Sequence, residues 1–474
     1  MELKNIDQTQ NTMKKSILII LFFIASPAFM FGQIIMSPYL QAVDTNSIYV
    51  LVECAKTDTV VVNYGLTPSY GLSAKTKFID TTTLSTGSYI HKVQLTGLTP
   101  NTLYYYQAVQ DTSISVGSTF RTAVSYGTNF RFAWMADCRT GVTVHDQISH
   151  LIDSINPLFS FYGGDMCHGQ TYAVWKEQFF RPNELKVISH IPFYFAAGNH
   201  EGWVKNTKAF VRNPTSASGT QDYFSFDYSF MHVLSINNQV AEDSGSAQYN
   251  FAASDLASSD KPWKIVFFHK PAYCAGGEGE NTNMKKMSTH IFVPNNVDLV
   301  LTGHSHFYQN NFVSGIPHLV IGAAGGPLQD PDSASFTVKS AKEYNFAIID
   351  VSLNDLIVMV YNNTGGLIDS LHLQKFTTGI EKNNEVVSNI VLYDNFPNPF
   401  SNTTNIKYLV TKSSDVKIVI SDITGHEIKT LVNKTMKPGP YEYSFDGSSL
   451  PDGTYFYNIK AGKYSETKKM ILKR

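Results

Sequence analysis

Five short polar blocks, each directly after an apolar run, constrain the fold of this chain more than any other feature. The apolar runs are residues 130–134, 158–162, 191–197, 263–268 and 297–302. Runs of this length and composition predict buried strands of a parallel or mixed sheet. The following blocks contain the side chains that can bind a metal: Asp137, Asp165, His168, Asn199, His269, His304 and His306. Because ligands of open α/β folds lie beyond the carboxyl ends of the strands, we expect these side chains at one rim of the sheet.

The blocks together supply carboxylates, imidazoles and an amide, a mixture that hard and borderline metal ions accept. A single Gly-His-Ser-His carries little information, whereas five blocks in a fixed order are far more specific. Their order resembles that of the calcineurin-like metallophosphoesterases, and most closely that of the purple acid phosphatases. The resemblance covers residues 128–375, about half of the chain.

The resemblance implies two metal ions bridged by one carboxylate. One ion would take Asp137, Asp165, His306 and the residue at position 168, and the other Asp165, Asn199, His269 and His304. Two ions roughly 3.5–4 Å apart can bind both the attacking oxygen and a phosphate oxygen, so a bridging hydroxide would be the nucleophile. His200 follows the amide ligand and would protonate the leaving oxygen or hold the phosphate; the alternative is that it only braces its loop.

Two positions depart from the family pattern. Purple acid phosphatases carry a tyrosine where this chain has His168, and other members carry a histidine where this chain has Arg139. An imidazole from His168 in place of the phenolate favours divalent Zn, Mn or Fe over ferric iron and predicts a colourless protein. The alternative is that His168 points away and leaves the first metal position weak or empty.

Other side chains near the blocks have open roles. Arg139 is a candidate for holding a phosphate with two hydrogen bonds, with a salt bridge to a nearby acid as the alternative. Glu278 stands where many relatives have a substrate-facing histidine, and its charge would repel phosphate. Cys138 and Cys167 could form a disulfide in an exported protein, or could be small buried thiols.

The flanking segments predict two β domains. Residues 33–125 alternate in the β manner, with strands expected at 47–53, 60–64 and 89–95, and resemble a fibronectin type III domain of the kind found before purple acid phosphatase domains. A polar linker is expected at residues 376–390. Residues 391–474 show evenly spaced strands with Gly, Asp and Pro turns. Their Asn-Phe-Pro-Asn-Pro-Phe opening, Gly-Thr-Tyr-Phe-Tyr strand and basic tail resemble the C-terminal sorting domain of the type IX secretion system.

Residues 1–32 have the features of a secretory signal: Lys14 and Lys15, then an apolar stretch, then a proline and small residues. No other segment is long and apolar enough to span a bilayer. The net charge of −2 gives no strong attraction to nucleic acid or to anionic membranes. We therefore expect export to the cell surface or the medium, with the type IX machinery as a partner.

These segments predict a multidomain fold: an N-terminal β-sandwich, a central α/β sandwich of mixed sheets flanked by helices, and a C-terminal β-sandwich. Helices are expected at 144–155 and 171–185. The resemblance implies a secreted phosphomonoesterase with two metal ions, divalent Fe, Zn or Mn, and a phosphoester substrate. The alternatives are a phosphodiesterase or nucleotidase on the same scaffold, and a surface binding protein with a degenerate site.

Overall fold

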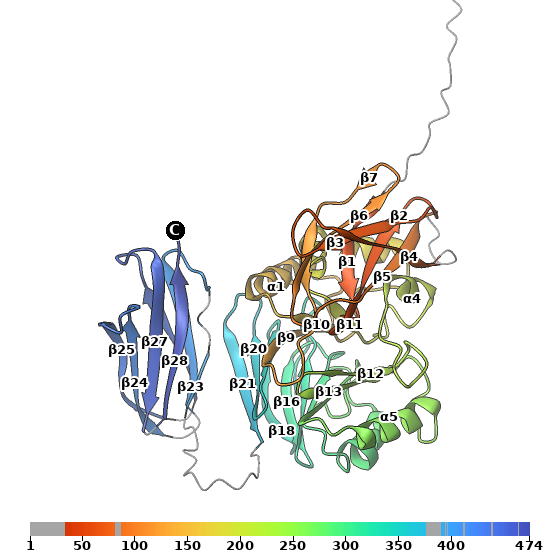
Figure 1. Ribbon diagram of the computed structural model, residues 1–474. Helices are drawn as coiled ribbons and strands as arrows, with labels where there is room; N and C mark the ends of the chain where they lie inside the picture. Colours follow the sequence, from red (N-terminus) through yellow and green to blue (C-terminus); the bar gives the residue numbers. More distant parts are fainter. Residues whose placement is uncertain are drawn as a thin grey trace, which may run out of the picture. The chain divides into compact units, whose positions relative to one another are not determined.

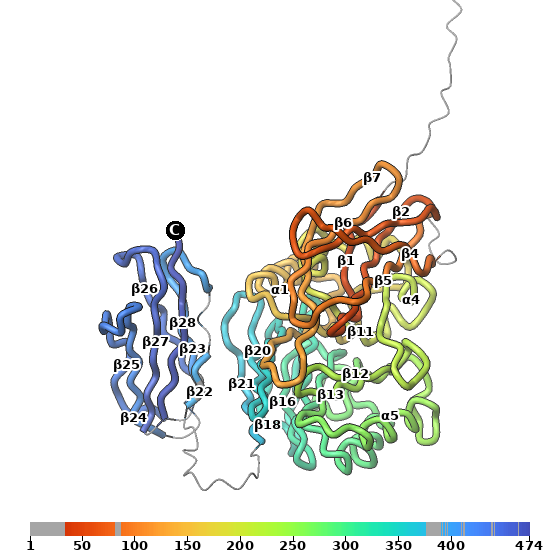
Figure 2. Tube along the Cα trace, in the orientation of Figure 1, coloured from red at the N-terminus to blue at the C-terminus, as the bar shows by residue number. Residues whose placement is uncertain are grey.

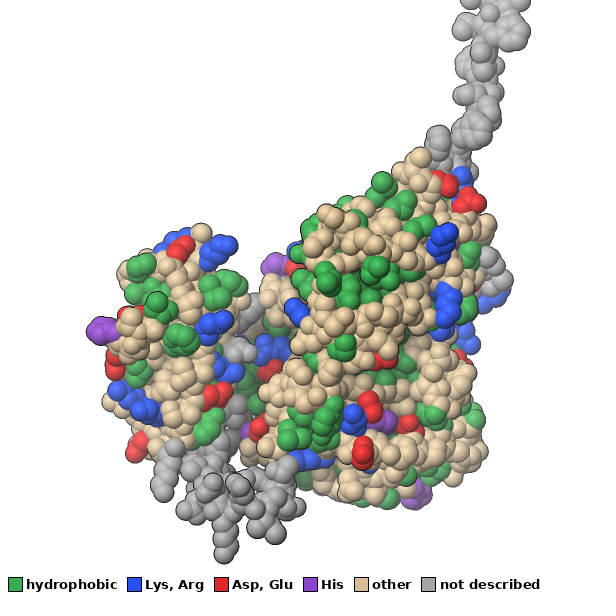
Figure 3. Space-filling view, viewed as in Figure 1, with side chains coloured by type: hydrophobic (Ala, Val, Ile, Leu, Met, Phe, Trp, Pro, Cys, Tyr) green, Lys and Arg blue, Asp and Glu red, His purple; other side chains and the backbone are tan. Residues whose placement is uncertain are grey.

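The computed structural model describes residues 34–80, 87–375, 390–393, 395, 397–410, 413–437, 439–462 and 464–474. The expected signal peptide and nearly all of the expected linker therefore lie outside the described residues. Within the described ranges, no helix combines the length and apolarity needed to cross a bilayer. On the face shown in Figure 3, lysine and arginine side chains are interspersed with aspartate and glutamate, in line with the small net charge.

The N-terminal segment is all β, as its alternating sequence predicts (Figure 1). Its strands are β1 (Ile34–Gln41), β2 (Ser47–Cys54), β3 (Val61–Gly65), β4 (Leu72–Asp80), β5 (Tyr89–Thr96), β6 (Leu103–Gln110), β7 (Ser113–Ile114) and β8 (Ser118–Arg121). β4 pairs with both β5 and β3, so the strands curl into one continuous sheet around a core that includes Val50, Val93 and Phe120. β1 also runs parallel to β11 of the central domain.

The central domain contains two mixed sheets. The first has the strands β9 (Phe130–Met135), β10 (Phe159–Tyr162), β11 (Phe193–Phe195), β19 (Phe346–Val351), β20 (Asp355–Tyr361) and β21 (Leu367–Gln374). The second has β12 (Phe224–Tyr228), β13 (Met231–Ser235), β14 (Trp263–Phe267), β15 (Leu299–Thr302), β16 (Tyr308–Val313), β17 (Ile316–Ile321) and β18 (Thr337–Ala341). All five apolar runs of the sequence therefore form strands.

The two sheets pack face to face through aromatic side chains, which explains why the runs are mostly apolar. Trp134 of β9 lies with its ring 6.0 Å from that of Phe267 on β14, and Phe161 of β10 stacks 4.5 Å from the same ring. The alternate residues Ala133 and Met135 of β9 face a second core with the helices. A strand that is buried on both faces shows no polar alternation.

Helices cover the outer face of each sheet. They are α1 (Val142–Ile155), α2 (Tyr172–Gln178), α3 (Pro182–Ile188), α4 (Lys205–Phe210), α5 (Ala247–Ser258), α6 (Thr282–Met287) and the π-helical turn η1 (Ser288–Phe292). Ile148 and Ile152 of α1 pack on the first sheet, and Leu256 of α5 packs on the second. The prediction of one helix at 171–185 is wrong, because Pro182 lacks an N–H and begins a new helix at its first position.

The C-terminal segment forms two further sheets, as expected for a small β-sandwich (Figure 2). Its strands are β22 (Ile390–Leu392), β23 (Thr403–Val410), β24 (Ser414–Ser421), β25 (Glu427–Met436), β26 (Gly439–Asp446), β27 (Gly453–Ala461) and β28 (Tyr464–Leu472). Ile418, Ile459 and Met470 belong to its buried core.

The expectation of one sheet rim needs correction. Asp137, Asp165 and Asn199 follow β9, β10 and β11 of the first sheet, whereas His269, His304 and His306 follow β14 and β15 of the second. Parallel pairing brings the carboxyl ends together within each sheet, and the face-to-face packing then brings the two sets together. The site therefore lies between two sheets and draws its residues from both.

Candidate metal centre

Tight backbone turns place the first residues of the site. Asp137, Asp165 and His304 have φ angles of 60°, 54° and 73°, a left-handed conformation that costs a non-glycine residue free energy and is concentrated at functional sites. Glycines make room around them. A Cβ on Gly198 would lie 2.1 Å from Asp165 Oδ1, and one on Gly303 would lie 2.4 Å from Asp137 Oδ2. The turns thus bring the backbone close to both carboxylates.

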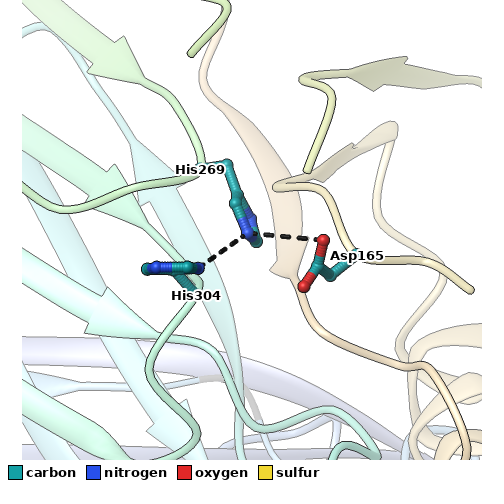
Figure 4. Close-up of side chains that lie close together, drawn as sticks. All are labelled: Asp165, His269 and His304. Carbon is teal, nitrogen blue, oxygen red and sulfur yellow. Dashed lines mark hydrogen bonds and ion pairs between the residues drawn. The ribbon is translucent and has the colours of Figure 1, made fainter. Parts of the chain in front are cut away.

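Four polar side chains converge beyond β10, β11, β14 and β15. His269 Nε2 lies 3.4 Å from Asp165 Oδ1, 3.1 Å from Asn199 Oδ1 and 3.2 Å from His304 Nδ1. Figure 4 shows three of them, Asp165, His269 and His304, pointing toward one another. The possible ligand atoms of these three lie within 4.8 Å of one another, as the ligands of a single ion would.

The hydrogen bond behind His269 determines what this cluster can hold. His269 Nδ1 donates to the carbonyl oxygen of Gly163 at 2.8 Å, so in the neutral ring Nε2 carries the lone pair. That lone pair faces the carboxylate of Asp165, the amide oxygen of Asn199 and a ring nitrogen of His304. These ligand atoms converge on one point, which either a proton on His269 Nε2 or a metal ion between them can satisfy. The residues present fit a metal ion at this position.

The electrostatics agree with this arrangement. Burial lowers the pKa of His269, but the carboxylates of Asp165 and Asp137 outweigh it and raise that pKa to about 9. Burial, followed by the charge on His269, lowers the pKa of His304 to about 3. Burial opposes ionisation of Asp165, yet the neighbouring histidines hold its pKa below the usual value. The carboxylates therefore attract positive charge to the point where the histidines meet.

Asp137 and His306 lie on the other side of Asp165. Asp137 Oδ2 accepts a hydrogen bond from the backbone N–H of His304 at 2.7 Å, and its Oδ1 lies 3.5 Å from His306 Nε2. His306 Nδ1 donates to the carbonyl oxygen of Pro327 at 2.7 Å, so its Nε2 is also an acceptor. Asp137 and His306 are two of the four residues that the sequence assigned to the first metal ion, together with Asp165 and His168.

Arg139 reaches one of these acceptors, His306, and two further groups of the site. Its guanidinium donates to His306 Nε2 and to His200 Nε2, and its Nε lies 3.7 Å from Asp165 Oδ2. The residue is only 9% exposed. The salt bridge that the sequence left as an alternative is thus present in the structure, with Asp165 as its carboxylate.

His200 lies in the site, whereas His168 lies at its edge. The backbone N–H of His200 donates to Asp165 Oδ1 at 2.9 Å, and burial is the main cause that lowers the pKa of its ring. His168 is exposed, its ring lies 4.5 Å from that of His200, and its backbone N–H donates to Gln178. Among the described residues, no hydrogen bond or ion pair joins the His168 ring to Asp137 or Asp165.

The sequence predicts no role for Glu201, which stands directly after His200. Its side chain is fully buried, and Oε1 accepts hydrogen bonds from the backbone N–H groups of Asp165 at 2.9 Å and Gly198 at 2.7 Å. Glu201 thereby ties the loops after β10 and β11 together. Burial first, and then the charge of Asp165, raise its pKa to about 8. The signal in the sequence was an acidic residue directly beside Asn199 and His200.

Two further features border the site. Gln329 accepts from the backbone N–H of His306 at 2.9 Å and donates to Glu278 at 2.8 Å. Gln329 thereby connects Glu278 to the rim of the site. A cavity of about 280 Å³ opens here. It is lined by Arg139, Thr140, His168, His306, Pro327, Leu328 and Gln329.

The cysteines near the site are free buried thiols. Cys138 Sγ lies 3.7 Å from Met135 Sδ and 3.8 Å from Met166 Sδ, and Cys167 donates to the carbonyl oxygen of Gly169 at 3.1 Å. The structure therefore has the buried-thiol alternative and not the disulfide. Burial raises the pKa of both thiols, which keeps them protonated.

Comparison with protein families confirms the three resemblances. Residues 39–122 match the purple acid phosphatase N-terminal domain, residues 130–308 the calcineurin-like phosphoesterase family, and residues 394–473 the secretion system C-terminal sorting domain. The further likeness of the first segment to fibronectin type III stays a prediction.

Individual relatives are distant. An uncharacterized protein of Mycobacterium tuberculosis is 27% identical over 289 residues, which cover 51% of this chain and 53% of the relative. Purple acid phosphatase 15 of Arabidopsis thaliana is 26% identical over 268 residues, 48% of this chain and 50% of the relative. The chain thus spans about half the length of these curated relatives. The structure of purple acid phosphatase PPD1 from yellow lupin (Lupinus luteus) seeds has the same fold, with a TM-score of 0.63, 18% identity and coverage of 71% of this chain and 74% of that one.

Proposed function

We propose that this chain, which carries a calcineurin-like phosphoesterase domain of the purple acid phosphatase type, is a secreted, metal-dependent phosphoester hydrolase. The observation that carries the proposal is the convergence of a carboxylate, an amide oxygen and two imidazole nitrogens from Asp165, Asn199, His269 and His304 on one point. A cluster with this set of ligand atoms has an evident use in a phosphoesterase fold. The alternative of a degenerate binding protein does not explain why all four side chains are aligned.

The four residues contribute different ligand atoms to the ion. Asp165 supplies negative charge, the two histidines supply neutral nitrogens, and Asn199 supplies a neutral oxygen, so the bound centre keeps a net positive charge. A divalent ion at this position supplies Lewis acidity toward a phosphate oxygen and lowers the pKa of water toward neutrality. The second ion that the sequence predicts, beside Asp137 and His306, stays a prediction.

The residues around the ion have separate roles in the proposed reaction. His200 lies beside Asp165 and is partly open to solvent; because its Nε2 accepts from Arg139, the proton that its ring would give to the leaving oxygen is the one on Nδ1. Arg139 supplies a positive charge with planar N–H donors, which suit the oxygens of a phosphate group. Glu201 acts only through the loops that it ties together, and is a positioning residue.

A phosphomonoester is the substrate class that we propose, on the likeness to purple acid phosphatases. One observation favours a phosphodiester or nucleotide instead. Glu278 lies near the rim through Gln329, and its negative charge repels the doubly charged group of a monoester more than the singly charged group of a diester.

The sorting domain gives the proposed location. It implies export by the type IX machinery to the cell surface or the medium, after passage through the inner membrane by a signal within residues 1–32. The substrate would then be an extracellular phosphoester.

The direct test is phosphate release by the full chain from chromogenic monoesters and diesters, each with Zn, Mn and Fe. Asp165→Asn removes the negative charge between the two sides of the site, and Asp260→Asn is the matched control because Asp260 is exposed between α5 and β14. We expect hydrolysis by the wild type and the control, and loss of at least 100-fold in Asp165→Asn, about 3 kcal/mol of barrier. No release with any of the three metals would contradict the proposal.

A further inference from the structure

The side of the centre that contains Asp137 and His306 differs chemically from the side that contains His269 and His304. Around His269, the ligand atoms of Asp165, Asn199 and His304 converge on the ring nitrogen Nε2. Around His306, the acceptors face a donor that the chain itself provides, the guanidinium of Arg139. We infer that the Arg139 guanidinium takes the place of one of the family's two metal ions, so that the centre holds one metal ion per chain. The inference rests on the proposed metal centre at Asp165, Asn199, His269 and His304.

The backbone directs Arg139 into the centre. Its φ angle of 31° is left-handed, and its N–H donates to the carbonyl oxygen of Asp165 at 3.3 Å. The side chain then reaches His306 and His200 and lies against Asp165. His306 Nε2 is available as an acceptor because Nδ1 donates to Pro327. The guanidinium thus meets the ring nitrogen and the carboxylate that a metal ion at this position would need.

The net charge of the centre differs between one bound metal ion and two. Asp137 and Asp165 together carry two negative charges, both buried. One divalent ion and one guanidinium leave the centre with a single positive charge, whereas two divalent ions and the guanidinium leave it with three. Arg139 is almost completely buried, so water cannot screen the repulsion between its charge and an adjacent ion. A second ion would have to expel the arginine side chain.

The chain also lacks the ligand that a second ion would use in place of Arg139. The tyrosine of purple acid phosphatases is His168 here, and its ring is exposed and turned toward His200. The histidine that other members place two residues after the first aspartate is Arg139 itself. Arg139 therefore removes a ligand and adds a positive charge, and His168 leaves its imidazole outside the centre.

This arrangement gives Asp137 and Arg139 definite roles. Asp137 anchors the His304 loop through its 2.7 Å hydrogen bond and helps to balance the guanidinium. Arg139 presents N–H groups beside the single metal position and toward the cavity that it lines with His168 and Gln329. A phosphate group would then be held between one metal ion and one arginine.

The test is the number of metal ions bound by the full chain. Protein saturated with Mn²⁺ and then desalted is analysed by elemental mass spectrometry and by electron paramagnetic resonance. We expect about one Mn per chain and the spectrum of an isolated ion. In Arg139→His, which restores the family's imidazole, we expect about two per chain and the spectrum of a spin-coupled pair. Arg121→His is the matched control, because the Arg121 guanidinium hydrogen-bonds to exposed Asn101 and lies outside the site, and this variant should still bind one.

The possible results bear separately on the number of metal ions and on the proposed hydrolase. Two coupled ions in the wild type would overturn the inference and leave the proposed hydrolase intact, provided that Asp165→Asn still abolishes phosphate release. One ion in both the wild type and a folded Arg139→His would show that Arg139 is not what excludes the second ion, and would also overturn it. No bound metal in the wild type would overturn both proposals. The wild-type spectrum decides the stoichiometry even if the variant does not fold.

Discussion

Glu201 offers a quantitative test of how the site is built. Replacing it with alanine removes the acceptor of two buried backbone N–H groups, those of Asp165 and Gly198. The side chain is fully buried, so water does not reach the two groups directly. Glu201→Gln keeps an acceptor oxygen in the same place and is the matched control.

The expected loss follows from the two hydrogen bonds. A buried donor left without a partner costs roughly 1–3 kcal/mol, so Glu201→Ala should lower the free energy of unfolding by about 2–6 kcal/mol. Glu201→Gln keeps both bonds but brings an amide NH₂ to the position of Oε2, which has no hydrogen-bond partner among the described residues. We expect it to cost less than half as much as the alanine variant.

Tryptophan fluorescence during urea unfolding measures this change in the central domain alone. All four tryptophans of the chain, Trp134, Trp175, Trp203 and Trp263, lie within that domain. A loss below about 1 kcal/mol in Glu201→Ala would refute the argument, because two buried N–H groups cannot lose their partner at so small a cost. A larger loss in Glu201→Gln than in Glu201→Ala would refute it as well.

Two further predictions concern histidines. His304→Ala should weaken metal binding at least about 100-fold in competition with a chromogenic chelator, whereas His168→Ala should leave it unchanged; equal losses would contradict the site as described. Burial lowers the pKa of His232, but hydrogen bonds to Asp227 and Asp255, both 2.8 Å, raise it to about 9. The His232 imidazole has a pKa of about 6.5 in the unfolded chain. Its raised pKa in the folded chain therefore stabilises the protein by roughly 1–3 kcal/mol below pH 6.5, and this stability is lost as pH rises through 9. Urea unfolding at a series of pH values should show this decline, and His232→Asn should lack it.

The strands that carry the site were predictable because their signal is local. Residues 130–134 and 263–268 are apolar except for Arg131 and Lys264 near their starts, since most of both faces of β9 and β14 is buried, and each run ends at a polar block. The division of these strands between two sheets was not predictable in the same way. A strand buried on both faces has the same sequence pattern in either sheet, so the pattern does not show which strands pair.

The positions of individual side chains were harder to predict than the blocks. His168 and Arg139 both follow strand ends, yet Arg139 turns into the centre and His168 lies on the surface. That difference depends on the left-handed backbone at Arg139 and on the hydrogen bond from His168 N–H to Gln178, neither of which leaves a mark in the sequence. The break before α3 was visible in advance, because Pro182 stands inside the expected helix, near its end.

The central claim is that a metal ion held by Asp165, Asn199, His269 and His304 is required for phosphoester hydrolysis. The most direct measurement is phosphate release by chelator-treated full chain as one divalent metal is added back stepwise, with bound metal measured in the same samples. We predict that phosphate release disappears on chelation and returns in proportion to bound metal. His269→Ala should regain neither bound metal nor phosphate release. Hydrolysis that survives chelation, or that returns equally in His269→Ala, would contradict it.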